Sequence, residues 1–324
     1  MRSLFILSFL LISIASRAQD TTWVPMKPDR WHRSMIEPGG TRWVSDEIDV
    51  HYSRLCMALG FEATVATGSY IALGQVWYKD YPKEKFHFFN DDAEWMGMDK
   101  IGHIVTSYTL GRYGVQSLIW CGVKEKKAVW LGALTGFVYQ TGLEIFDGYS
   151  SGWGFSVGDM LANAGGYFLL TGQYLIGNRY YFAPKFSFYP SGYAQYRPSL
   201  LGENTGQQIL KDYNAQIYWL SANISSFLDR DSNFPAWLNI AVGYGANGMT
   251  GGKNNPPYYN NATGNYETFS RYRQFYISPD INLAALNFRS EWLRRTARLL
   301  NFIKVPLPGL MIAQGKLSAQ WISH

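Results

Sequence analysis

Three short polar motifs interrupt apolar, glycine-rich stretches of the chain, and they carry the residue types that can do chemistry. Their polar side chains are Asp99, Lys100 and His103 in the first motif, Glu144 and Asp147 in the second, and Asp159 and Asn163 in the third. Spacings of three or four residues put side chains on one face of a helix. A lone acidic side chain at the centre of a membrane helix costs about 2.5 to 3.5 kcal/mol. We therefore expect the three helix faces to converge on one buried polar cluster, which is the candidate functional site.

The cluster offers groups for acid–base chemistry. A carboxylate one helical turn from an imidazole, as Asp99 is from His103, orients the ring, raises its basicity or shares a metal ion with it. Two carboxylates as close as Glu144 and Asp147 raise at least one carboxyl pKa unless a cation lies between them. The catalytic candidates are therefore His103, Asp99 and Glu144. The structural alternative is a polar core that only fixes the register of the helices.

The same residues offer ligands for a divalent metal ion. The candidate ligands are His103, Glu144, Asp147 and Asp159, with Asp99 as a further oxygen donor. One nitrogen and several oxygens suit zinc, manganese or another divalent ion. A single histidine is few for a zinc site, so a metal cofactor stays an alternative at this stage.

Other catalytic motifs are weak or absent. Gly148-x-Ser150-x-Gly152 has the spacing of a nucleophile elbow, but that elbow follows a strand, and here we expect a helix before it. We interpret it as a turn. The sequence contains neither a glycine-rich phosphate loop nor a His-Glu-x-x-His motif.

Four apolar segments are expected to position the motifs, and the fold class we predict is α+β. The segments are residues 55–78, 101–122, 129–146 and 157–176. Short connections favour antiparallel neighbours, so residues 51–178 are predicted to form an antiparallel bundle of about four helices. The segments have nearly the length that crosses a bilayer, which leaves open whether they span a membrane, lie half-sunk at its surface or form a soluble bundle.

After about residue 178 the pattern changes to the alternation typical of strands. Residues 237–244, 274–283 and 316–322 alternate, and residues 214–224 are rich in β formers. Residues 179–324 are therefore predicted to form a β-rich, envelope-associated region. Residues 245–268 read as a long loop. Residues 291–304 read as one basic amphipathic helix, with Lys304 on its basic face, that packs on the sheet with its arginines in solvent or lies on an anionic membrane.

The first residues indicate export. A basic start, an apolar run and the sequence Ser16-Arg17-Ala18 predict a signal peptide over residues 1–18. Gln19 follows it, where a lipoprotein would carry cysteine, so no lipid anchor is expected. Residues 19–50 lack periodicity and are predicted to be an extended lead segment. We expect an exported protein of the cell envelope, at the outer membrane or in the periplasm.

Composition favours a membrane or another envelope component as the partner. Charged residues make up 16% of the chain and aromatic residues 17%, whereas soluble proteins average about 25% charged. The formal charge of +5, from 29 basic and 24 acidic residues, is too small to favour nucleic acid. Cys56 and Cys121 lie in apolar stretches without zinc-site spacing; we interpret them as two buried thiols, with a single disulfide as the alternative.

The motifs together resemble a known family. The order Asp99-Lys100-x-x-His103, Glu144-x-x-Asp147 and Asp159-x-x-x-Asn163-x-x-Gly166 resembles the YfiM-like family, a domain of unknown function described as predicted periplasmic or outer-membrane lipoproteins. It is also similar to VanZ-like membrane proteins, which are linked to glycopeptide resistance and often have Gln at the position of Asp147. The resemblance covers about residues 91–174 and implies an envelope protein of undefined activity.

These observations predict an exported, membrane-associated envelope protein that binds or organises an envelope component through its Asp/His/Glu cluster. Two alternatives stay open. One is a metal-assisted hydrolase or transferase that acts on a lipid or phosphate ester, and the other is a structural scaffold. Enzymatic activity and protein partners are left undetermined by the sequence.

Overall fold

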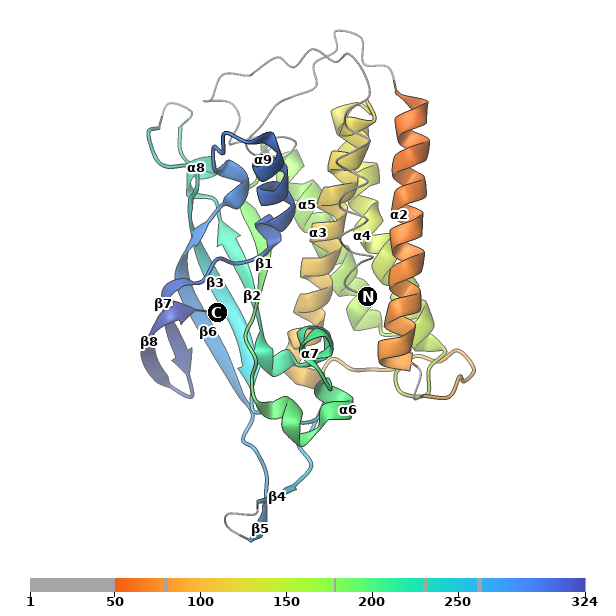
Figure 1. The fold of residues 1–324 in the computed structure, drawn as a ribbon, viewed down its shortest axis with the longest axis vertical. Helices are drawn as coiled ribbons and strands as arrows, with labels where there is room; N and C mark the ends of the chain where they lie inside the picture. The colour runs from red at the N-terminus through yellow and green to blue at the C-terminus, as the bar shows by residue number, and fades with distance from the viewer. Residues whose placement is uncertain (1–49, 79–80, 178, 230–231, 261–263, 324) are drawn as a thin grey trace.

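The computed structural model describes residues 50–78, 81–177, 179–229, 232–260 and 264–323. A helical bundle in the first half is followed by an antiparallel sheet in the second (Figure 1), so the predicted α+β fold class is confirmed. The predicted signal peptide lies outside the described residues, as does the lead segment up to residue 49.

The bundle consists of long helices joined by short turns, as the apolar segments predict. Its helices are α2 (Tyr52–Leu73), α3 (Met98–Trp120), α4 (Glu125–Gly148) and α5 (Val157–Gly177). A π-helical turn, Gly74–Tyr78, extends α2. Figure 1 shows α2 on the side of the bundle away from the sheet, whereas α3, α4 and α5 all pack on one another.

Small residues bring α3 and α4 close together. A Cβ atom at Gly136 would overlap the backbone oxygen of Ser107, and one at Gly132 would overlap the backbone of Val115. Such close backbone approach is typical of helix pairs that cross at glycine. The apolar core around this crossing consists of Tyr108, Val115, Val129, Ala133, Leu170 and Tyr180.

The second half forms a six-stranded sheet in the order β1-β2-β3-β6-β7-β8, with every neighbouring pair antiparallel. Its strands are β1 (Phe182–Phe188), β2 (Gln216–Ala222), β3 (Leu238–Asn247), β6 (Tyr272–Ile281), β7 (Leu307–Ala313) and β8 (Lys316–Ser323). Short helices α6 (Pro198–Leu201), α7 (Thr205–Lys211) and α8 (Ile224–Phe227) lie in the connections.

Two expectations about the second half were wrong. The predicted loop over residues 245–268 contains the end of β3 and a separate hairpin of β4 (Tyr258–Asn260) and β5 (Asn265–Glu267). The predicted helix over residues 291–304 ends early: α9 covers Glu291–Leu299, and a 3-10 turn, Leu300–Phe302, follows it.

The two faces of the sheet have the reverse of the usual polarity. On the buried face, Ser221, Ala241 and Ser278 are neighbours across three strands, and Asn239 and Asp280 form the next cross-strand pair. On the opposite face, one cross-strand row is apolar: Leu220, Val242, Ile277, Leu310 and Ala319. The exposed fraction is 54% for Val242 and 42% for Ile277. The sheet therefore buries polar groups and exposes apolar ones.

A sealed ion cluster occupies the buried face of the sheet. Lys185 Nζ lies 2.7 Å from Asp280 Oδ2, and Lys304 Nζ lies 3.9 Å from Asp280 Oδ1, with all three side chains 0% exposed. Lys304 also donates to the backbone oxygen of Val305 at 2.8 Å. This corrects the expectation that Lys304 belongs to the basic face of a helix, because the helix ends before Lys304 and its side chain turns inward. We call these three residues the sealed cluster.

The cysteines do not pair. Cys56 is exposed on α2, and Cys121 is buried at the end of α3. The interpretation as buried thiols is right for Cys121 and wrong for Cys56, because α2 leaves much of its surface uncovered.

The bundle meets the sheet along α3. Met98 packs with Ala246 and Met249 in a small apolar cluster, and Tyr108 donates its hydroxyl hydrogen to the backbone oxygen of Phe182 at 3.1 Å. The start of α3, which carries the first polar motif, is thus held against the strands.

Candidate functional site

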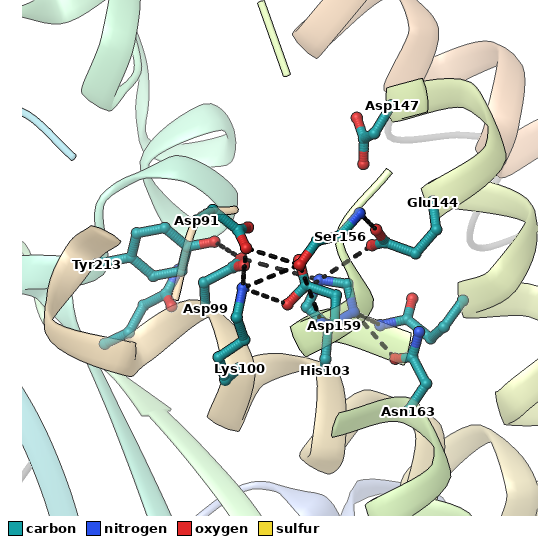
Figure 2. A network of polar contacts seen from close by, with 12 residues as sticks. Asp91, Asp99, Lys100, His103, Glu144, Asp147, Ser156, Asp159, Asn163 and Tyr213 are labelled. Carbon is teal, nitrogen blue, oxygen red and sulfur yellow. Dashed lines mark hydrogen bonds and ion pairs between the residues drawn. The ribbon is translucent and has the colours of Figure 1, made fainter. Parts of the chain in front are cut away.

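The polar cluster lies at one end of the bundle, where α3 and α5 begin and α4 ends (Figure 2). Asp99 and Asp159 lie in the first turns of α3 and α5, where the helix dipole favours an anion. Ser156 precedes α5, and its Oγ accepts a hydrogen bond from the backbone nitrogen of Asp159 at 3.1 Å. The helix ends therefore position both carboxylates.

A left-handed turn leads the chain into α3. Trp95, Met96 and Gly97 have φ values of 47°, 55° and 82°. Non-glycine residues in this region cost on the order of 1 to 3 kcal/mol each and need support from their surroundings. Tyr244 of β3 supplies it by donating its hydroxyl hydrogen to the backbone oxygen of Met96 at 2.6 Å. The sheet thus fixes the orientation of the first motif.

Lys100 is the cation at the centre of the acidic groups. Its Nζ lies 2.5 Å from Asp91 Oδ1, 2.8 Å from Asp159 Oδ1 and 3.6 Å from Asp99 Oδ2. Ser156 also donates its hydroxyl hydrogen to Asp91 Oδ1 at 2.6 Å. The salt bridges join the loop before α3 to the start of α5.

His103 lies among three carboxylates without touching any of them directly. Its Nε2 lies 3.7 Å from Glu144 Oε1, 3.8 Å from Asp159 Oδ1 and 3.8 Å from Asp99 Oδ1. Its Nδ1 lies 2.9 Å from Asn163 Oδ1, which fixes the ring. Each of the three carboxylate distances exceeds hydrogen-bond length. We call Asp91, Asp99, Lys100, His103, Glu144 and Asp159 the open cluster, because the side chain of Asp99 is 24% exposed and that of His103 15%.

The crowding of acids shifts the protonation equilibria. Burial raises the pKa of Glu144 to about 7 against the opposing charge of His103. Burial and the charge of Asp99 raise the pKa of Asp159 to about 8. Burial lowers the pKa of His103, but the charges of the three carboxylates outweigh it and the net shift is upward. The open cluster therefore favours an added proton or cation over its fully ionised form.

Asp147 does not join the open cluster, although it shares a helix with Glu144. Its Oδ1 accepts a hydrogen bond from the Tyr78 hydroxyl at 2.7 Å, and it lies apart from the other carboxylates in Figure 2. Burial raises its pKa to about 7. Asp147 thus attaches the end of α2 to the bundle.

The site also contains residues that the motifs did not point to. Asp91 comes from the loop before α3, and Tyr213 reaches across from the sheet region to donate its hydroxyl hydrogen to Asp99 Oδ1. Gln140 is buried, with its Nε2 3.2 Å from His103 Nδ1. Only Gln140 had a local signal, because it precedes Glu144 by one helical turn.

The comparisons agree with the resemblance seen in the sequence. The fold and the site define a class of protein in which a helical bundle carries a histidine–carboxylate cluster and packs on an antiparallel sheet. Residues 87–172, which contain α3, α4 and most of α5, match the family model described as "Predicted periplasmic lipoprotein (DUF2279)", a domain of unknown function. No curated protein and no solved structure matches the chain.

The family description supports a location in the cell envelope. The similarity to VanZ-like membrane proteins stays a prediction. The catalytic and metal-binding roles of the open cluster also remain predictions.

Proposed function

We propose that this protein is exported, associates with a membrane of the cell envelope, and binds the polar part of an envelope component at the open cluster. The observation that carries this proposal is the reversed polarity of the sheet. In water, burying apolar surface stabilises a fold by roughly 25 cal/mol per Å², and a polar interior with an apolar exterior gives up that contribution. Lipid removes the conflict, as it does for sheets that face hydrocarbon on one side and a polar interior on the other.

The outer faces of the helices support the same proposal. Residues 52–78, comprising α2 and the turn after it, are long and apolar enough to cross a membrane by length and composition, and 6% of their most apolar window is buried. Length and composition alone are weak support. Exposed apolar side chains also occur on the neighbouring helices, among them Val138 of α4 and Phe168 of α5.

The open cluster supports the choice of a polar ligand. Four carboxyl groups face one lysine and one histidine, and four of these six side chains are 15 to 24% exposed: Asp91, Asp99, Lys100 and His103. An excess of acceptors at an accessible site favours a ligand that brings cationic charge or hydrogen-bond donors.

Liposome flotation tests the association with lipid. Full-length mature protein is mixed with vesicles of phosphatidylethanolamine and phosphatidylglycerol, and the fraction that floats is measured. We expect the wild type to float and Val242→Lys/Ile277→Lys to float at least threefold less. Gln195→Lys/Asn254→Lys adds the same charge on polar loops and serves as the control. Wild-type protein that stays soluble without detergent and does not float would overturn the proposal.

One observation favours a second function, a metal-assisted hydrolase or transferase acting on a lipid or phosphate ester. His103 Nε2 faces three carboxylates at similar distances, an arrangement suited to a metal ligand or a general base. Turnover of bis-p-nitrophenyl phosphate with added Mn²⁺, lost in His103→Gln, would support this alternative; no turnover by the wild type would count against it.

A further inference from the structure

We propose that Asp99, His103 and Asp159 bind a divalent metal ion of the zinc or manganese class, with Glu144 as an additional oxygen ligand. The inference rests on the proposed function, since it names the cation that the open cluster takes. One ligand atom from each of Asp99, His103 and Asp159 lies within 4.8 Å of the others.

The first argument is the orientation of His103. Asn163 Oδ1 lies 2.9 Å and Gln140 Nε2 lies 3.2 Å from Nδ1, so Nε2 is the nitrogen that faces the carboxylate oxygens, 3.7 to 3.8 Å away. In the tautomer with the hydrogen on Nδ1, Nε2 is free to ligate a cation that lies between the ring and these oxygens. Fixing the ring through its other nitrogen is also how proteins hold a histidine that ligates a metal.

The second argument is the position of a buried carboxylate oxygen. Asp159 is 3% exposed, and Lys100 Nζ pairs with its Oδ1 at 2.8 Å. The same oxygen also faces His103 Nε2 at 3.8 Å. A single oxygen can lie against both a lysine and a bound cation, so Asp159 Oδ1 is placed to act as a metal ligand beside His103.

The third argument is charge. The carboxyl groups of Asp91, Asp99, Glu144 and Asp159 surround one ammonium group, that of Lys100. This crowding disfavours the fully ionised state, and added protons or a bound cation relieve it. Lys100 Nζ lies nearest Asp91 and Asp159 and farther from Asp99, at 3.6 Å, so less positive charge lies beside Asp99 and Glu144. A divalent ion beside His103 supplies that charge.

The fourth argument is geometry. Metal–nitrogen and metal–oxygen bonds of about 2.0 to 2.2 Å place ligand atoms roughly 3.3 to 3.6 Å apart in a tetrahedral site. The Nε2–oxygen distances in the open cluster are 3.7 to 3.8 Å, so small side-chain movements complete the site. The carboxylate ligands are also oriented by partners: Glu144 Oε2 accepts from the backbone nitrogen of Ser156 at 3.1 Å, and Asp99 Oδ1 accepts from Tyr213.

The test is direct metal binding by the purified full-length protein in detergent. The protein is stripped with a chelator and titrated with ZnCl₂ by calorimetry and with MnCl₂ by electron paramagnetic resonance. We expect one ion per chain. Loss of a residue that only orients a metal ligand weakens binding by about 10- to 100-fold. We expect Asn163→Ala to weaken binding within that range and His103→Gln to weaken it by more.

Asp147→Asn is the matched control, since Asp147 is a buried acid on the same helix as Glu144 but outside the proposed ligand set. We expect it to bind metal like the wild type. If His103→Gln fails to fold, Asp99→Asn replaces it, because Asp99 is the most accessible of the ligands.

Absence of stoichiometric binding, or equal affinity in the wild type, His103→Gln and Asp99→Asn, would overturn the inference and leave an imidazolium bridged by water. Metal binding is measured without lipid vesicles. Its failure is therefore distinguishable from a failure of membrane association in the flotation assay.

Discussion

The molecule contains two polar clusters in apolar surroundings, and they solve the problem of buried charge differently. In the sealed cluster, Lys185 and Asp280 meet directly at 2.7 Å, and no side chain reaches solvent. In the open cluster, Lys100 Nζ pairs directly with Asp91 and Asp159 at 2.5 and 2.8 Å, but His103 Nε2 comes no closer than 3.7 Å to a carboxylate, and Asp99 is partly exposed. Direct, closed pairing is typical of a structural ion pair, whereas the indirect, accessible pairing of His103 leaves a place for a ligand. From this comparison we expect the sealed cluster to contribute stability, and we propose that the open cluster binds a ligand.

The largest effect is expected from removing the anion of the sealed cluster. Asp280→Asn leaves Lys185 and Lys304 buried without a counter-ion, and breaking a buried pair in this way costs about 3 to 5 kcal/mol. The free energy of unfolding, measured by denaturant titration in detergent, is expected to fall by that amount. A loss below about 1 kcal/mol would mean that the sealed cluster is not a structural ion pair.

The pH dependence of stability is the next largest effect. Burial lowers the pKa of Lys304 to about 8 from 10.5, although Asp280 opposes the shift. Between these pH values the unfolded chain holds the proton that the folded chain has released, so stability rises with pH by up to about 3 kcal/mol from this group. Lys304→Met removes this contribution, and its curve from pH 8 to 10 is expected to be flatter than that of the wild type.

Lys185 is the internal check on that experiment. Burial lowers its pKa as well, and Asp280 lies beside both lysines, so a smaller rise with pH remains in Lys304→Met. Curves for the wild type and Lys304→Met that run parallel would exclude Lys304 as the titrating group.

The close approach of α3 and α4 predicts a third effect. Gly136→Ala places a methyl group on the backbone oxygen of Ser107, and overpacking of this kind costs about 1 to 3 kcal/mol. Gly172→Ala is the control, because nothing lies within 4 Å of the added methyl group. Thermal unfolding that ranks the two variants in the reverse order would contradict the close crossing.

The smallest effect on stability is expected at the open cluster itself. Asp99→Asn removes a partly exposed charge but keeps an oxygen that accepts from Tyr213, so the free energy of unfolding is expected to change by less than about 1 kcal/mol. Complementation of a deletion strain by Asp99→Asn is expected to fail even though the variant folds. Unfolding of the variant would instead identify the open cluster as a structural core.

Much of the bundle could be predicted from the sequence, because long apolar segments with short polar connections permit few arrangements. The convergence of Asp99, His103 and Asp159 also followed from local spacing and from the cost of burying each group alone. The contributions of Asp91 and Tyr213 could not be foreseen. They depend on the path of a loop and on contacts over more than a hundred residues, for which a single sequence carries no local signal.

The sheet shows the limit of pattern analysis more clearly. Alternation identified β3 and β6, but alternation is the same whichever face turns inward, and the ordinary rule would have buried Val242 in place of Asp280. β7 was not predicted. Pro308 and Gly309 are unfavourable inside a strand, and a shift of register between Leu307 and Gly309 accommodates them. Lys304 looked like part of a solvated helix because the early end of α9 is set by packing.

Because of the hydroxyl groups of Tyr213 and Tyr244, the first half of the chain does not contain the whole site. Tyr213 contacts Asp99, and Tyr244 holds the turn that introduces α3. Both tyrosines belong to the half of the chain beyond residue 178. A fragment that ends at that boundary would keep His103 but lose the two hydroxyl groups that position Asp99 and the turn before α3. The two halves are separate in sequence, but both contribute residues to a single site.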